Sequence, residues 1–94
     1  MNHIRRWFNE RTRVRVEAER ALGVRLDALV QGLRDRLPSY RLASIVEYSD
    51  QAEFEIAIES VWAEIAGGLM LTATEREELA ELARKWRVIL PDAD

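Results

Sequence analysis

The chain contains no cysteine and a single histidine, His3, among its 94 residues. The absence of cysteine excludes disulfides, thiolate catalysis and cysteine-based metal sites, and it leaves the cellular compartment undecided. His3 has no carboxylate partner at a defined spacing, and carboxylates alone are a poor ligand set for a transition metal. We therefore expect no metal, no cofactor and no catalytic residue.

Long apolar runs are also missing from the sequence. No segment approaches the ~20 apolar residues that a membrane-spanning helix needs. Trp7-Phe8 is followed at once by Asn9-Glu10-Arg11, so the start of the chain lacks the apolar region of a signal peptide. Gly67-Gly68 leads into hydrophobic residues, the reverse of the order in a phosphate-binding loop. We expect a cytoplasmic protein that is not an enzyme and does not contact a membrane.

The composition is that of a folded domain, since 48% of the residues are hydrophobic and 33% are charged. A chain of this length forms one domain around one core. We expect a single helical domain over residues 1–94. It would consist of an Arg-rich N-terminal helix over residues 1–22 and a helical core over residues 24–90.

Charge is distributed unevenly along the chain. Residues 1–25 hold seven arginines and three glutamates, a net charge of +4, whereas residues 26–94 hold seven basic and fourteen acidic residues, a net charge of −7. An acidic body repels nucleic acid and favours a basic partner, whose approach it accelerates. A solvated helical face explains the same charges without any partner.

The clearest helix covers residues 51–66. Apolar residues recur there at three- and four-residue steps and line one face, with glutamates between them. Asp50 and Glu53 have the spacing of a capping box, and Gly67-Gly68 ends the helix. Similar periodicity elsewhere predicts an all-α fold, a small bundle of four to five helices.

The start of the chain allows two helical interpretations. One has helices over residues 3–22 and 25–37 with a break at Gly23. The apolar faces are nearly in phase across this glycine, so one helix from about residue 3 to 37 fits as well. Residues 12–17 also alternate as a strand would, but no partner strand is evident and a helix is favoured.

The remaining helices have recognisable starts. Ser39 can cap a helix over residues 40–48, and capping boxes that begin at Thr72 or at Thr74 both fit the start of the last helix. The stripe that we expect this last helix to bury comprises Leu79, Leu82, Ala83 and Trp86. After it, Ile89-Leu90 would fold back onto the bundle.

The run Glu53-Phe54-Glu55-Ile56-Ala57-Ile58-Glu59 is the centre of a family resemblance. Supporting segments are Leu26-Asp27-Ala28-Leu29, Tyr48-Ser49-Asp50-Gln51, Leu71-Thr72 and Glu78-Leu79-Ala80-Glu81-Leu82-Ala83. Together, over about residues 24–88, they resemble the MafI family of small bacterial immunity proteins. The resemblance implies an all-helical protein that binds and neutralises a cognate polymorphic toxin, commonly a nuclease. Glu55 stands where the family motif commonly has a glycine, and residues 1–23 extend beyond the usual core.

The resemblance and the charge together suggest non-catalytic inhibition of a toxin, a basic nuclease domain, through an acidic surface. We expect this surface to be built on the helix over residues 51–66. The residues that we expect to contact the toxin are Glu55, Ile56 and Glu59, followed by Glu47, Asp50 and Glu64. Ile56 fits packing against the first helix equally well, and Asp50 fits a purely capping role.

Two alternatives use other features. Arg11, Arg13 and Arg15 could contact the phosphates of a nucleic acid, as an antitoxin-like or regulatory protein would, with Trp7-Phe8 stacking on bases. Interspersed glutamates and the acidic body argue against nucleic acid as the partner. A third alternative is a subunit of a helical assembly, which would self-associate without a foreign partner.

Overall fold

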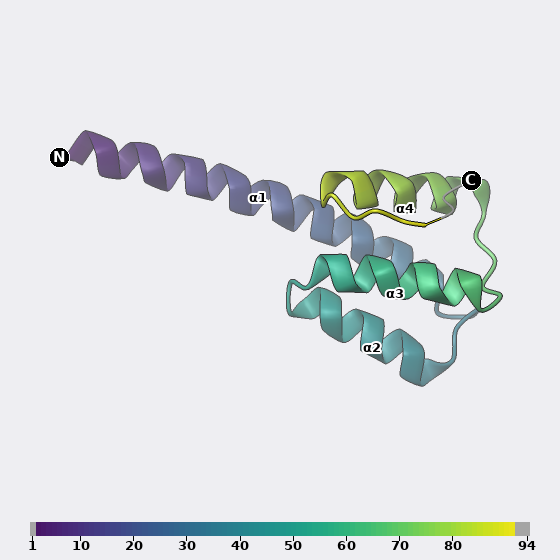
Figure 1. Cartoon of the computed structure of the whole chain (residues 1–94). Coiled ribbons are helices and arrows are strands. Elements are labelled where there is room, and N and C mark those ends of the chain that lie inside the picture. The colour runs from purple at the N-terminus through teal and green to yellow at the C-terminus, as the bar shows by residue number, and fades with distance from the viewer. Residues whose placement is uncertain (1, 92–94) are drawn as a thin grey trace.

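The structure, a computed structural model, describes the backbone of residues 2–91 and the side chains of residues 13–91. It contains four helices in the order α1 (Asn2–Gly32), α2 (Ser39–Asp50), α3 (Phe54–Ala66) and α4 (Ala73–Lys85). All regular secondary structure in this part of the chain is helical, which confirms the predicted all-α class. In Figure 1, α2 and α3 form a hairpin, and α4 lies beside the C-terminal part of α1.

The helix α1 runs unbroken through Gly23. Of the two helical interpretations, the one without a break at Gly23 is confirmed, and so is the preference for a helix over residues 12–17. A Cβ atom at Gly23 would lie 3.2 Å from two atoms of the Phe54 ring. That ring stacks on Trp86, with 4.6 Å between ring centroids. Glycine costs about 1 kcal/mol in a helix interior, and this close aromatic packing against the backbone offsets the cost.

The core lies between the C-terminal part of α1 and the three shorter helices. α1 and α3 each contact all three other helices. The buried hydrophobic residues are Leu26, Leu29, Val30, Leu33, Leu37, Ile45, Ala57, Ile58, Val61, Leu69, Leu79, Leu82 and Ala83. Burial of each large aliphatic side chain stabilises the fold by about 1.5–3 kcal/mol. The predicted stripe of the last helix is confirmed, with Trp86 half-buried at its end.

The first two-thirds of α1 project beyond the bundle (Figure 1). Val14 is 64% exposed, and Ala18 and Ala21 are exposed as well, so the bundle does not cover this part of the predicted apolar face. The 31-residue α1 is about 46 Å long, whereas helices of 12–13 residues span about 20 Å. We call residues 2–21 the arm and residues 22–91 the body. The predicted apolar side chains of residues 4, 7 and 8 lie outside the described ones.

The first helix ends at Gly32, five residues before the predicted boundary. The N–H groups of Leu33 and Arg36 bond to carbonyls three residues back, at 2.9 Å each, which tightens the chain into turns. The residue before a proline is restricted to extended conformations, so the helix could not have included Leu37, which precedes Pro38.

Three helices are followed, two residues after their last residue, by a residue with positive φ, namely Ala52 (59°), Gly68 (114°) and Arg87 (56°). The N–H of Gly68 bonds to the carbonyl of Ile65 at 3.0 Å, and the next N–H bonds to that of Glu64 at 2.9 Å. This pair of bonds defines the Schellman motif. Equivalent pairs close the other two helices without a glycine.

The turn between α2 and α3 differs from the predicted cap. Asp50 is the last residue of α2, and Glu53 precedes α3 without a side-chain capping bond, so the predicted Asp50–Glu53 capping box is wrong. The Schellman bond from the N–H of Glu53 to the carbonyl of Tyr48, at 2.8 Å, uses this segment to end α2 instead. Ser39 is likewise the first residue of α2 and not its cap, because Pro38 occupies that position.

The start of the last helix follows the prediction at Thr72. The hydroxyl of Thr72 accepts the N–H of Glu75 at 3.1 Å, and the Glu75 carboxylate accepts the N–H of Thr72 at 2.8 Å. After α4 the chain turns back along the bundle (Figure 1). Leu90 packs against the core as predicted, but Ile89 is 92% exposed.

Gly23→Leu should destabilise the protein by about 1–3 kcal/mol, because the new side chain displaces the Phe54 ring from its stack on Trp86. Leucine has a high helix propensity, so a loss of stability would come from disturbed packing and not from a weaker helix. Urea unfolding followed by far-UV circular dichroism measures it. The matched control is Gly32→Ala, where the added Cβ would lie 3.6 Å from a Glu75 carboxylate oxygen. Equal stability of both variants would contradict the close approach at Gly23.

Ala52→Gly should stabilise the protein by up to about 1 kcal/mol, because glycine adopts positive φ without the clash that alanine suffers. Gly68→Ala should destabilise it by a similar amount. No atom lies within 4 Å of a Cβ built at Gly68, so that change tests backbone conformation alone. Thermal unfolding of the two variants measures both effects. A shift of the melting temperature in the same direction for both would refute the positive φ of Ala52 and Gly68.

Candidate functional site

The acidic side chains of the body divide into two groups. Those that pair with arginines are Glu64, Glu75, Glu78 and Glu81. Glu47, Asp50, Glu55 and Glu59 are exposed and form no ion pair with another described residue. Asp27, Asp35, Glu53 and Glu77 are likewise exposed and without an ion pair to a described residue, so the four carboxylates on α2 and α3 are one part of the uncompensated charge of the body.

On α3, the exposed residues Glu55, Ile56 and Glu59 form what we call the α3 acidic face. The opposite side of the helix buries Ala57, Ile58 and Val61, which fixes the orientation of this face. Ile56 is 43% exposed, so the interpretation that it packs against the first helix is wrong. The face thus offers two carboxylates one helical turn apart with an aliphatic side chain beside them.

Glu47 and Asp50 add negative charge from the neighbouring helix, α2. Both side chains are exposed, and the Nε2 of Gln51 makes a long 3.4 Å hydrogen bond to the Glu47 carboxylate. Asp50 has no capping role in the structure, so its carboxylate is available at the surface.

Glu64 differs from the other five residues that we predicted to contact a toxin. The guanidinium of Arg41 donates to its carboxylate at 2.8 Å, and the Glu64 side chain is 17% exposed. This ion pair joins α2 to α3 and compensates the charge of Glu64. Glu64 therefore holds the hairpin together and contributes little to the acidic surface.

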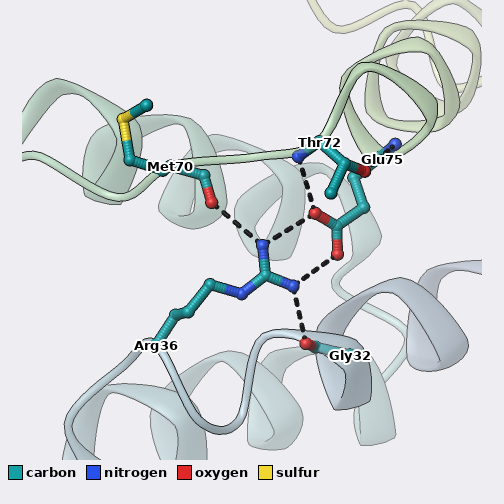
Figure 2. A network of polar contacts seen from close by, with 5 residues as sticks. All are labelled: Gly32, Arg36, Met70, Thr72 and Glu75. Atoms are coloured by element: carbon teal, nitrogen blue, oxygen red, sulfur yellow. Dashed lines mark hydrogen bonds and ion pairs between the residues drawn. The ribbon is translucent and has the colours of Figure 1, made fainter.

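Arg36 forms a second structural network, shown in Figure 2. Its guanidinium donates to both oxygens of Glu75, at 2.8 and 2.6 Å, and to the carbonyls of Met70, at 3.0 Å, and Gly32, at 2.8 Å. These bonds tie the end of α1 to the linker and to the start of α4. The Arg36 hydrogen bonds, with a smaller contribution from Thr72, lower the pKa of Glu75 from 4.5 to about 2.

A third arginine, Arg25, lies between two carboxylates of α4. Its Nε donates to Glu78 at 3.1 Å, and its Nη2 lies 3.3 Å from Glu81. The hydrogen bond from Arg25 lowers the pKa of Glu78. An open groove of about 460 Å³ passes between α1 and α4 at this point. Of the four glutamates that line it, Glu75, Glu78 and Glu81 pair with Arg36 or Arg25, so it is a weaker candidate site than the α3 acidic face.

Ser49 is a polar contact that the sequence analysis missed. Its hydroxyl donates to the carboxylate of Asp27 at 2.6 Å, and Ser49 is 6% exposed. We expected the helix to end at residue 48, but α2 extends to Asp50. The signal was present, because Ser49 continues the helical spacing of Leu42 and Ile45, which face the core.

The arm carries the residues of the nucleic-acid alternative. Arg13 and Arg15 are exposed, and neither forms an ion pair with another described residue. The side chain of Arg11 lies outside the described ones. The arm thus presents basic groups away from the acidic body.

Among the described residues, no group of three His, Cys, Asp or Glu side chains is placed to hold a metal ion. Within the same residues, every buried side-chain nitrogen or oxygen atom has a hydrogen-bond partner. None of the described helices is long and apolar enough to cross a membrane.

Comparisons of this chain with protein-family models, with curated proteins and with solved structures found no significant match. Function is therefore inferred from the surface chemistry and from the motif around Glu55.

The pKa of Glu75 predicts a pH-dependent contribution to stability. Its folded-state pKa of about 2 lies below the ordinary 4.5, so ionised Glu75 stabilises the fold above about pH 4.5, and this contribution is lost as the pH falls toward 2. Urea unfolding of the wild type and of Glu75→Gln should differ most above pH 5 and converge near pH 2. Glu77→Gln is the control, because Glu77 has no ion pair to a described residue. A difference that does not change with pH would refute the role of the Arg36 bonds.

Proposed function

We propose that this protein is an immunity protein that binds and neutralises a cognate bacterial toxin by non-catalytic inhibition. The surface that binds is the α3 acidic face, extended by Glu47 and Asp50. One observation carries the proposal: these carboxylates are exposed and uncompensated on a helix whose other side is locked into the core. They are thus positioned for a partner outside the body.

The chemistry of this surface favours a basic partner. Two glutamates at positions i and i+4 lie about 6 Å apart on one side of a helix and repel each other, so a cation between them is favoured. Ile56 supplies apolar area that a partner could desolvate. A nuclease must hold polyanionic substrate and so presents basic groups, which an acidic protein can occupy. Such complementarity raises the association rate and selects the partner.

The sequence motif supports the same function. The run from Glu53 to Glu59 resembles the MafI family of immunity proteins, and in the structure it forms the first half of α3, the helix that carries the acidic face. Where the family motif commonly has a glycine, this chain has the exposed Glu55. That substitution adds charge to the face and suits a toxin with a strongly basic surface.

The second candidate function is nucleic-acid binding by the arm. The exposure of Arg13 and Arg15 on a helix that projects from the body favours it. Glu17 and Glu19 on the same arm reduce the attraction for phosphates, and the acidic body reduces it further.

Affinity purification of the tagged protein from its native lysate, with mass spectrometry of what co-purifies, separates the two functions. A stoichiometric protein with a toxin-type C-terminal domain, inhibited on addition of the purified chain, supports immunity. Recovery of nucleic acid alone at moderate salt would instead support nucleic-acid binding by the arm.

Reversal of charge on the α3 acidic face should slow association with that toxin. Glu55→Arg combined with Glu59→Arg should lower the association rate at least about tenfold at low ionic strength, and the difference should shrink as salt is added. Both positions are exposed, so helicity by circular dichroism should not change. Stopped-flow or surface-based kinetics measures the rate.

The matched control is Asp35→Arg combined with Glu77→Arg, which makes the same change in net charge at two exposed positions elsewhere on the body. An equal slowing in both double variants would show an effect of net charge alone. An unchanged rate in the Glu55/Glu59 variant would remove this face from the proposal.

A further inference from the structure

The exposed apolar row of the arm continues a side of α1 that faces α4 across an open groove in the body. Val14, Ala18 and Ala21 recur at four- and three-residue steps, and the same steps lead on to Arg25 and Ala28. In the body, this side faces α4, where Arg25 pairs with two carboxylates and Ala28 lines the groove. Beyond the end of α4, no described residue covers it. The arm thus has an exposed apolar row against which no described helix packs.

The charges of the chain indicate what kind of surface can pack there. Residues 1–21 hold six arginines and three glutamates, a net charge of +3, whereas residues 22–94 hold eight basic and fourteen acidic residues, a net charge of −6. Arg13 and Arg20 are seven residues apart and lie beside the apolar row on one side of the helix. A complementary surface is therefore acidic with an exposed aliphatic side chain, which describes the α3 acidic face.

The arm cannot reach the α3 acidic face of its own chain. α1 is a continuous helix through the point where it leaves the body, and Figure 1 shows the arm directed away from α3. The basic arm can therefore contact an α3 acidic face only in another molecule. A second copy offers both surfaces at once, so that two identical contacts close around a twofold axis.

We propose that this chain forms a reciprocal dimer in which the arm of each copy lies along the α3 acidic face of the other. Arg13 and Arg20 pair with Glu55 and Glu59, and Val14 contacts Ile56. The arm is about 30 Å long and α3 about 20 Å, so the arm covers the whole face. This inference does not depend on the proposed function. If a toxin also binds the α3 acidic face, dimer and toxin complex exclude each other.

A second copy fits the arm better than a nucleic acid does. Glu17 and Glu19 both stand between Arg15 and Arg20, and in a nucleic-acid complex they would lie near phosphates. The row of Val14, Ala18 and Ala21 gives phosphates nothing to contact, whereas a protein helix can bury it.

A charge-swap experiment tests the dimer. Sedimentation equilibrium of nuclease-treated, full-length protein at low salt should show a monomer–dimer equilibrium. Arg13→Glu with Arg20→Glu, and separately Glu55→Arg with Glu59→Arg, should each weaken association at least about tenfold. An equimolar mixture of the two variants should form a heterodimer, because the reversed arm of the first meets the reversed face of the second, and the native arm of the second meets the native face of the first.

The control pair is Arg34→Glu with Arg76→Glu, which changes net charge equally at exposed positions of the body and should dimerise as the wild type does. Circular dichroism of each variant separates lost association from lost folding. A monomeric wild type, or a mixture that stays monomeric, overturns the proposal. Nucleic acid retained by the wild type, and lost in the Arg13/Arg20 variant alone, would assign the arm to nucleic acid instead.

Discussion

The fold depends on the close approach of the Phe54 ring to α1 at Gly23. The absence of a side chain there lets the start of α3 rest against the helix backbone, and Trp86 stacks on the same ring. One aromatic cluster thereby joins α1, α3 and the end of α4. It lies where α1 leaves the body, so the residue that could have broken the helix instead marks the boundary between a covered segment and an exposed one.

Glutamate has two different roles in this molecule, and the presence of an arginine within reach decides between them. Arg25, Arg36 and Arg41 each reach a carboxylate on another helix and hold two elements together. The carboxylates of Glu55 and Glu59 meet no such partner in the described residues. Exposed ion pairs contribute little to stability individually, but their positions determine where the negative charge of the body remains uncompensated. The acidic surface is thus formed by carboxylates that no internal ion pair compensates.

Much of the helical layout could be predicted from periodicity, because the stripe of Leu79, Leu82 and Ala83 needs no tertiary information. The predictions failed or stayed open where a distant residue decides the outcome. In the sequence, Gly23 indicates a possible helix break, because the contact with the Phe54 ring cannot be known. Asp50 likewise indicates a helix cap, because the positive φ of Ala52 cannot be known. The exposure of Ile56 and Glu59 follows from the buried side of α3, whereas the pairing of Glu64 with Arg41 depends on how the hairpin packs. Immunity function itself stays a proposal.

Because α1 is continuous, the number of residues between the body and an arm residue fixes the direction in which that side chain points. Each residue of an α-helix turns the chain by about 100° and advances it by about 1.5 Å. A single insertion between Leu22 and the arm would therefore rotate every arm side chain by more than a quarter turn relative to α3, while the body would remain unchanged. Loops tolerate changes in length readily, but this junction would not. Evolution of the segment is thus expected to proceed by substitution, with insertions and deletions confined to the outer end of the arm.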